Sequence, residues 1–309
     1  MLVSVALVFA ALAVLFVGAE TLVRAAHRMA DGLGVPPLLV GLTVVAYGTS
    51  APELTVSVTA ALDGRLDLII GNALGSNVFN ATVVIGVAAL AAPLASEERL
   101  IRVDLPLGIA VVGLVAVLAG FGGLGRADGV ALVLVLVAFT VAMIVGARSG
   151  TRAARSPVHA GRLARDVVLV GIGIGLLVVG GGWLVDGSVR LAEGWGASER
   201  WIALTLVAGG TSAPELAASL VAALRGRRDL ALGNVVGSNL FNLTAVLGSG
   251  AALAPIAAPM TLVSLAPDLA AAGVVAIALL SVAATGRRIG RVEGAVLLAA
   301  WIVWVVVRA

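Results

Sequence analysis

The sequence lacks cysteine and lysine altogether, and only 12% of its 309 residues are charged. Without cysteine the chain can form no disulfide, iron–sulfur cluster or thiolate metal site. Soluble domains average about 25% charged residues, so this charge content excludes an ordinary soluble domain. The basic residues are all arginines. We ascribe their excess to membrane topology, because arginines gather in the loops on one side of a membrane protein, and not to a nucleic-acid partner.

Long apolar segments dominate what is present. Hydrophobic residues make up 61% of the chain, and the mean hydropathy is +1.13. The apolar runs are about 17–25 residues long, the length of a helix across the hydrocarbon layer. They lack the alternation over about 10 residues that marks an outer-membrane barrel. We therefore predict an all-α integral membrane protein with ten transmembrane helices, near residues 2–22, 36–61, 67–92, 103–121, 128–148, 166–190, 199–223, 229–254, 264–284 and 290–308.

One long polar connection divides these spans five and five. It predicts a first five-helix repeat over 1–148, a cytoplasmic linker over 149–165 and a second five-helix repeat over 166–309. The loops after odd-numbered spans hold 15 of the 20 arginines. By the positive-inside rule these loops are cytoplasmic and both termini lie outside the cytoplasm. Because residues 2–19 lack a basic leader, we expect a retained first helix in the cell (inner) membrane and not a cleaved signal peptide.

Two sequence phrases recur at one constant spacing. The segment 47–53, YGTSAPE, recurs as GGTSAPE at 209–215, and 71–80, GNALGSNVFN, recurs as GNVVGSNLFN at 233–242. Both pairs lie 162 residues apart without a gap. Five spans separate the copies, and because five is odd the two halves enter the membrane in opposite senses. The sequence therefore predicts two inverted-topology repeats, with a substrate site at the midplane where they meet.

Each phrase places a glutamate, Glu53 or Glu215, in the middle of a predicted span. A carboxylate at the bilayer centre costs at least about 3 kcal/mol, so a chain that places two there is expected to use both. Pro52 and Pro214 supply no N–H and clash with the carbonyl four residues back. Each helix should therefore break and turn backbone carbonyls toward a cavity within the protein.

The side chains expected beside the glutamates offer many further oxygen atoms. They come from the hydroxyls of Thr49, Ser50, Thr211 and Ser212, and from Asn72, Ser76 and Asn80 with their copies Asn234, Ser238 and Asn242. Because Asn72, Ser76 and Asn80 are four residues apart, they lie on one helix face, and their copies likewise share one face of the second helix. Oxygen ligands suit hard cations such as Ca²⁺ and Na⁺ and argue against zinc or copper.

Other interpretations of single residues were weighed against this one. A glycine or serine in a membrane helix usually serves packing, and a single asparagine there is as often an interhelical hydrogen-bonding residue as a ligand. Duplication of the whole cluster at one spacing nevertheless favours a binding site. Ser50 or Ser212 would suit an intramembrane serine hydrolase, yet no histidine or lysine lies in any predicted span to act as a base. We therefore expect the protein not to be an enzyme.

The paired phrases, GTSAPE followed by GNxxGSNxFN, resemble the alpha repeats of the sodium/calcium exchanger family within the cation/calcium exchanger superfamily. The ten-span layout agrees along the whole chain, and the absence of a large insertion between the halves resembles the prokaryotic type. The resemblance implies a secondary active antiporter that works by alternating access. It also implies Na⁺ and Ca²⁺ as substrates, the lipid bilayer as surroundings, no cofactor and no obligate protein partner.

The resemblance further implies which residues bind the ions. Glu53 and Glu215 would bind Ca²⁺ together with Thr49 and Thr211. The Na⁺ sites would share the glutamates and use Ser50, Ser76, Ser212, Ser238 and the carbonyls of Ala46 and Ala208, with Asn80 and Asn242 at the central position. Some prokaryotic and potassium-dependent members carry aspartate at the position of Asn242. Asparagine in both halves argues against a potassium requirement and leaves no third acid to hold a proton.

Three functions stay open at this point. Na⁺/Ca²⁺ exchange is favoured, because two carboxylates nearly neutralise one Ca²⁺ and a set of Na⁺ ions can neutralise them instead. A Ca²⁺/H⁺ antiporter of the same fold is the alternative, and a passive cation channel is a distant third.

Overall fold

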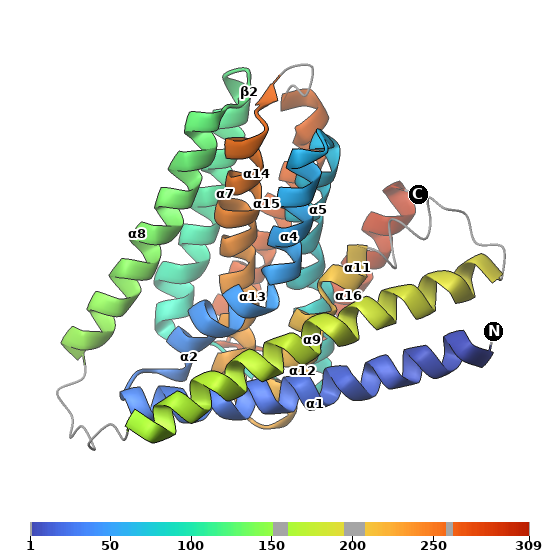
Figure 1. Ribbon diagram of the computed structural model, residues 1–309. Helices are drawn as coiled ribbons and strands as arrows, with labels where there is room; N and C mark the ends of the chain where they lie inside the picture. Colours follow the sequence, from blue (N-terminus) through green and yellow to red (C-terminus); the bar gives the residue numbers. More distant parts are fainter. Residues whose placement is uncertain (1, 151–159, 195–207, 258–261, 309) are drawn as a thin grey trace.

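The computed structural model describes residues 2–150, 160–194, 208–257 and 262–308 (Figure 1). The structure is 88% helix, which confirms the predicted all-α class. In these ranges the only sheets are two antiparallel ribbons of two-residue strands. β1 (Leu94–Ala95) pairs with β4 (Arg288–Ile289), and β2 (Gly123–Leu124) pairs with β3 (Ile256–Ala257). Each ribbon therefore joins a turn in the first half of the chain to a turn in the second.

The first half of the chain forms five helical segments joined by short turns. They are α1 (Leu2–Leu33); α2 (Pro37–Val40), the π-helical turn η1 (Gly41–Val45), α3 (Ala46–Thr49) and α4 (Ala51–Leu62); α5 (Leu66–Phe79), η2 (Asn80–Val84) and α6 (Ile85–Ala91); η3 (Leu100–Asp104) and α7 (Leu105–Gly120); and α8 (Arg126–Gly150).

The second half follows the same order. Its elements are α9 (Ala160–Gly194); α11 (Ala208–Thr211) and α12 (Ala213–Leu224); α13 (Arg228–Phe241), η5 (Asn242–Val246) and α14 (Leu247–Leu253); α15 (Leu262–Ala284); and α16 (Arg291–Arg308). Residues 151–159 of the predicted linker and the first part of the span expected over 199–223 lie outside the described residues, whereas 149–150 end α8 and 160–165 begin α9.

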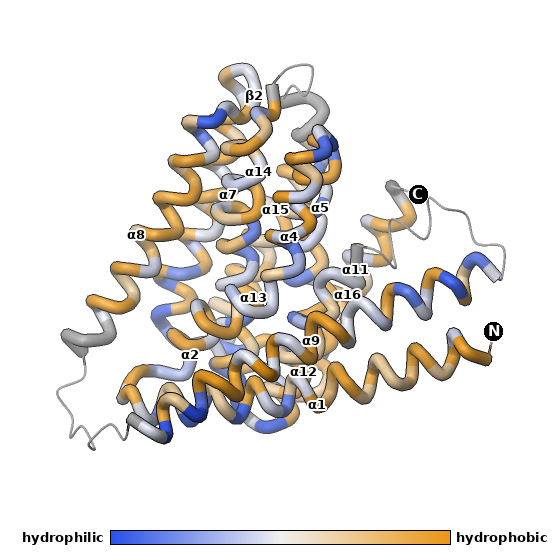
Figure 2. The backbone as a smooth tube through the Cα atoms, in the orientation of Figure 1, coloured by the Kyte–Doolittle hydropathy of each residue, from blue (hydrophilic) through white to orange (hydrophobic). Residues whose placement is uncertain are grey.

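Seven described helices are long and apolar enough to cross a membrane, or eight if the bent pair Pro37–Thr49 and Ala51–Leu62 counts as one span. They identify the chain as a multi-pass integral membrane protein. Figure 2 shows the outer helix α8 hydrophobic over most of its length, as expected for a surface in contact with lipid. The count of ten spans stays a prediction.

Two segments form the centre of the molecule. In the most apolar window of Leu66–Ala91, 78% of residues are buried, and in that of Arg228–Leu253 the share is 94%, against 28% for α1 and for α9. These two central segments carry the recurring asparagine and serine phrases. Burial on all sides places these polar side chains inside the protein, where each needs a partner or a ligand.

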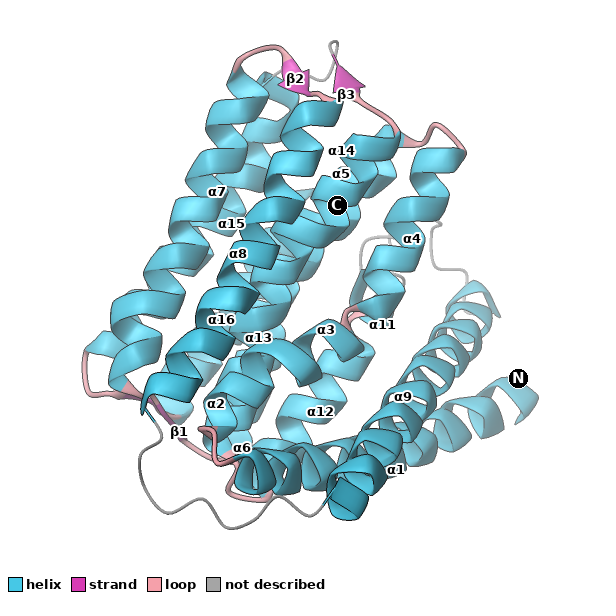
Figure 3. Cartoon of the chain, turned by 60° about the vertical axis from the view of Figure 1, so that its left-hand side comes forward, coloured by secondary structure: helices cyan, strands magenta, loops and turns pink. Residues whose placement is uncertain are grey.

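The long helices α1 and α9 pack side by side in opposite directions (Figures 1 and 3). Small residues bring their backbones close together. A Cβ added to Gly18 would lie 3.1 Å from the carbonyl oxygen of Gly173, and one added to Gly180 would lie 3.3 Å from that of Ala11. Close approach through small residues is a common means of helix association in membranes. This pair runs obliquely beside the rest of the bundle (Figure 3).

Candidate cation-binding site

The second span is broken where the sequence predicts it. Helix α3 ends at Thr49 and α4 begins at Ala51, and the span bends by 45° between Pro37–Thr49 and Ala51–Leu62. Ser50 between them has φ −85° and ψ 10°, and Ser212, between α11 and α12, has nearly the same values, −90° and 10°. A proline near the start of each following helix fits there, because a first-turn N–H has no intrahelical partner to lose. The break lies at the serine, two residues before the proline.

The break places each glutamate in the first turn of a new helix. Glu53 lies in the first turn of α4 and Glu215 in the first turn of α12, and both are completely buried. The positive end of a helix dipole favours a negative charge at this position. The local sequence therefore stabilises two carboxylates that the membrane would otherwise disfavour.

Each glutamate is bound by the serine of the other half. The Ser50 hydroxyl donates a hydrogen bond to Glu215 Oε1 at 2.8 Å, and the Ser212 hydroxyl donates one to Glu53 Oε1 at 3.1 Å. Because each serine precedes its own glutamate by three residues, the two broken helices exchange partners across one small volume. The structure thus brings the two acids of the repeat together.

Further oxygens surround Glu215. The hydroxyls of Thr49 and Ser238 lie near its carboxylate. Both hydroxyls lie beside the Ala46 carbonyl oxygen, Thr49 at 3.3 Å and Ser238 at 3.4 Å. A hydroxyl both accepts and donates, so these groups can orient lone pairs toward a cation. The Ala46 carbonyl expected to face the site is therefore adjacent to it, although it also accepts the Ser50 N–H at 3.0 Å.

Asparagines fix the backbone that carries the acids. Asn72 donates to the carbonyl oxygen of Glu53 at 2.8 Å, and its copy Asn234 donates to that of Glu215 at 3.3 Å. Asn234 also accepts the Thr49 hydroxyl at 3.1 Å and donates to Ser219 at 2.8 Å. The predicted helix face of α5 and α13 thus does turn toward the glutamates. Gly237 on α13 allows close approach of the second span, since a Cβ there would lie 2.4 Å from the Leu42 carbonyl oxygen, whereas a Cβ at its copy Gly75 would meet no described atom within 4 Å.

The remaining expected residues lie in the same buried region. Ser76, Asn80 and Asn242 are 3%, 0% and 0% exposed. Asn80 and Asn242 open the π-helical turns η2 and η5, and such widened turns occur often at functional sites. Thr211 closes α11 and is partly exposed. Ala208 begins α11, and its side chain is outside the described residues.

Several buried polar atoms have no hydrogen-bond partner in the described part of the protein. Those in this region are Oε2 of Glu53 and of Glu215, Nδ2 and Oδ1 of Asn80, and Oδ1 of Asn239 and of Asn242. Neither glutamate forms an ion pair with a described arginine or histidine. Two buried carboxylates without a counter-charge are costly. A cation bound between them would remove this cost, so the arrangement fits a site for hard cations.

Sequence reasoning missed one pair of polar residues near the site, Ser57 and Ser219. Ser57 donates to the Val246 carbonyl oxygen at 2.7 Å, and its copy Ser219 receives Asn234. Asn77 and Asn239 donate to each other's backbone carbonyl oxygens, at 3.0 Å and 3.4 Å. The signal for the serines was available, since they obey the 162-residue spacing and Ser57 lies one helical turn after Glu53. The bonds of Ser57, Asn77 and Asn239 tie the two halves together.

Comparison with known proteins agrees with this geometry. The family model described as sodium/calcium exchanger protein matches residues 3–145 and 166–309. The chain is 40% identical to CaxA of Alkalimonas amylolytica, named as a candidate antiporter, over 98% of this chain and 97% of that protein. It is 30% identical to the sodium/calcium exchanger MaX1 of Methanosarcina acetivorans over 94% of each chain. A solved structure of the sodium-calcium exchanger NCX_Mj superimposes with a TM-score of 0.84 at 29% identity, covering 99% and 98% of the two chains.

The fold and the buried acid pair define a membrane antiporter for cations. The chain belongs to the sodium/calcium exchanger protein family. That family comprises exchangers, and the resemblance noted in the sequence is confirmed.

Proposed function

We propose that this protein is a secondary active antiporter that exchanges Na⁺ for Ca²⁺ across the cell membrane by alternating access. The observation that carries the proposal is the exchange of partners between the halves, in which Ser50 binds Glu215 and Ser212 binds Glu53. A shared site built from both halves is the arrangement that alternating access requires. The relative MaX1, named a sodium/calcium exchanger, supports the choice of ions.

The proposed ligands are the oxygens gathered in this volume. Glu53, Glu215, Thr49 and Thr211 would bind Ca²⁺; Ser50, Ser76, Ser212, Ser238, the carbonyls of Ala46 and Ala208, and the glutamates would bind Na⁺; Asn80 and Asn242 complete the central position. The unpartnered Oε2 atoms of the two glutamates support this assignment, because they offer charge that no described protein group neutralises. All are oxygens, as Ca²⁺ and Na⁺ prefer.

Coupling follows from the shared glutamates. Two carboxylates nearly neutralise one Ca²⁺, and Na⁺ ions can neutralise the same charges, so the two occupancies exclude each other. An empty site with two negative charges is costly to enclose in a low-dielectric barrier. Only the occupied site therefore changes its side of access, which prevents leakage of one ion without the other.

The proposed topology is ten spans in two inverted repeats, with both termini outside the cytoplasm. Paired contacts at the 162-residue spacing support the repeat, among them the mutual bonds of Asn77 and Asn239. The antiparallel pair α1 and α9 is the moving element in this scheme. It lies beside the rest of the bundle (Figure 3), and α9 contacts the broken helices at α3 and α11, so its movement would change access to the site.

Ion flux into vesicles tests the proposal. Vesicles loaded with Na⁺ and carrying the purified protein are expected to accumulate ⁴⁵Ca²⁺ when Na⁺ is diluted outside, and a pH gradient alone is expected to drive none. Accumulation driven by the pH gradient instead would establish Ca²⁺/H⁺ exchange. Flux that only follows the Ca²⁺ gradient, with no accumulation, would identify a passive channel. Omission of K⁺ is expected to change nothing, because Asn242 replaces a possible third acid.

A further inference from the structure

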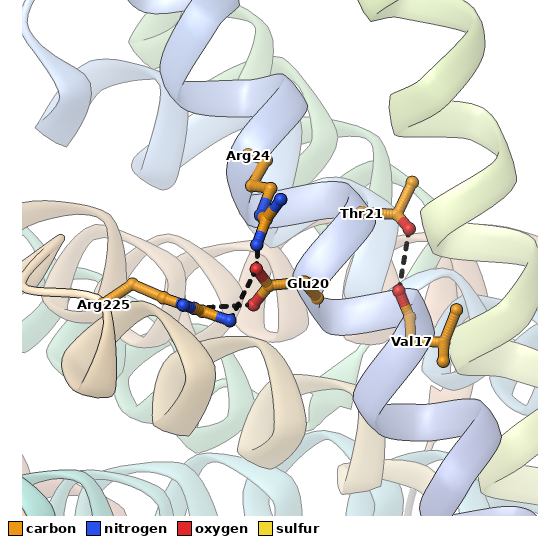
Figure 4. Close-up of polar contacts among 5 residues, drawn as sticks. All are labelled: Val17, Glu20, Thr21, Arg24 and Arg225. Atoms are coloured by element: carbon orange, nitrogen blue, oxygen red, sulfur yellow. Dashed lines mark hydrogen bonds and ion pairs between the residues drawn. The ribbon is translucent and has the colours of Figure 1, made fainter.

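The second half of α1 is bound to the loop between α12 and α13. Glu20 accepts two bonds from Arg225, Nε to Oε2 at 2.9 Å and a terminal nitrogen to Oε1 at 2.9 Å (Figure 4). Arg24, one turn further along α1, binds the same carboxylate. The Glu20 side chain is only 15% exposed. A forked arginine–carboxylate pair of this kind is both stronger and more directional than a single contact.

Two neighbouring contacts act along the same stretch of α1. His27 contacts Arg227, in the same loop as Arg225. Arg28 donates to Asp166 of α9 at 2.8 Å. The second half of α1 is thus bound by side-chain contacts to the loop before α13 and to α9.

These contacts have no equivalent in the other half of the repeat. The 162-residue spacing maps Glu20 onto Gly182 and Arg225 onto Asp63, so an ion pair is impossible there. It maps His27 onto Val189, which cannot form the second contact. The ion-binding phrases are duplicated, whereas the charges that tie α1 to the loop are present once.

The packing of the helices shows the same difference. Helix α1 packs along α12, whereas in the described structure α9 and α4, the equivalent pair, hardly touch. Ala213 and Pro214 of α12 are buried, while Ala51 and Pro52 of α4 are partly exposed. One side of the site is therefore covered by a long helix, and the equivalent side is less covered.

We propose that Glu20 and Arg225 form an ionic latch that favours the state in which α1 covers α12, on the arginine-rich side of the membrane. The proposal rests on the proposed antiport by alternating access. The duplicated site treats both sides alike, so the unequal energies of the two access states come from contacts that are not duplicated. The latch makes the site face away from the arginine-rich side at rest.

The expected size of the effect follows from the strength of an ion pair in which Arg225 is half exposed and Glu20 is largely buried. Loss of the latch is expected to change the ratio of the two access states by about fivefold. The apparent Kd on a given side equals the intrinsic Kd divided by the fraction of protein that is open to that side. Removal of the latch should thus lower the half-saturating Ca²⁺ concentration on the arginine-rich side by about three- to fivefold and raise it slightly on the other side.

The half-saturating Ca²⁺ concentration on each side can be measured in inverted and in right-side-out membrane vesicles that contain the full chain. Glu20→Gln and Arg225→Gln are expected to give the same opposite shifts on the two sides, and thermal stability of each variant reports folding. Arg24→Gln is the matched control. It also removes an arginine from Glu20, but that contact lies within α1 and joins no second element, so no shift is expected.

A converse variant builds the latch in the other half. Gly182→Glu combined with Asp63→Arg is expected to shift the half-saturating Ca²⁺ concentrations on the two sides in the opposite directions to the latch variants. The glutamate can be accommodated, because a Cβ at Gly182 meets no described atom within 4 Å. Shifts in the same direction on both sides, no shift in either latch variant, or an Arg24→Gln shift equal to that of Arg225→Gln would each overturn the latch. If the unmutated chain shows Ca²⁺ uptake and its variants show no shift, the latch alone fails. If it shows no coupled uptake, the proposed function fails as well.

Discussion

The two broken helices, α3–α4 and α11–α12, carry nearly the same phrase but are held in place differently. They are equivalent at the serine that binds the glutamate of the other half, because Ser50 binds Glu215 and Ser212 binds Glu53. The phrases differ at their first residue, Tyr47 against Gly209. The equivalence lies where ions are proposed to bind, and the difference lies where the helix packs.

The packing around that first residue explains the substitution. The Tyr47 ring contacts the Phe241 ring in a tilted arrangement with ring centroids 5.0 Å apart, and its hydroxyl is hydrogen-bonded to the Thr140 hydroxyl at 2.7 Å. On the other side, Phe79 lies so close to Gly209 that a Cβ there would be 3.1 Å from its ring. An aromatic side chain fits one helix and is excluded from the other. Duplication of a site therefore does not require duplication of its supports.

The largest expected effect comes from removing either acid. Glu53→Gln and Glu215→Gln should each reduce Na⁺-driven Ca²⁺ flux at least about 100-fold, because each removes a charge that both ions are proposed to share. Flux into vesicles measures this, and gel filtration with thermal unfolding confirms that each variant folds. Substantial exchange in one variant would break the equivalence of the two helices and refute the shared-ligand account.

The crossed serine bonds should have the next largest effect. Ser50→Ala and Ser212→Ala each remove a hydrogen bond to a charged group, worth about 1.5–3 kcal/mol, so the apparent Ca²⁺ affinity should fall about tenfold or more in both. Titration of Ca²⁺ in the flux assay gives the two values. Similar losses would support equivalence, while a loss confined to one serine would show that only one helix contributes. Ser4→Ala, on α1 at a distance from the phrase in sequence, is the control.

The asparagines should reveal the difference between the halves. Asn234 makes three side-chain bonds, to Glu215, Ser219 and Thr49, whereas one is found for Asn72. Asn234→Ala should therefore destabilise the protein by about 2–3 kcal/mol and Asn72→Ala by about 1 kcal/mol. Thermal unfolding in detergent compares them. Equal losses would mean that the support of the two acids is symmetric after all.

The smallest expected effect concerns Tyr47. Tyr47→Phe keeps the ring contact with Phe241 and loses the bond to Thr140, so stability should fall by about 1 kcal/mol with little change in Ca²⁺ affinity. Thr140→Val removes the same bond from the other side. If the double variant is no less stable than either single variant, the bond accounts for the whole loss. A large fall in affinity would instead place Tyr47 in the site.

Much of the fold was available from the sequence. The apolar runs indicated the helical membrane class, and the described helices coincide with most predicted spans to within a few residues. Two are longer: α1 continues to Leu33 where residue 22 was expected, and α9 covers Ala160–Gly194 where 166–190 was expected. The expected break in the second span is present at Ser50. The π-helical turns were not foreseen, because a single widened turn leaves no clear mark on hydrophobic periodicity.

The sequence by itself determined that two acids, each preceded by a serine and a proline, would lie within apolar helices, because hydropathy and backbone chemistry are local properties. It could not determine that each serine would bind the acid of the other half, or that Asn77 would face Asn239. Periodicity assigns a residue to a face of its own helix, and only the packing of segments distant in the chain decides what that face meets. For the same reason, only the tertiary structure shows that Glu20 of α1 binds Arg225, an ion pair present in one half of the repeat and not in the other.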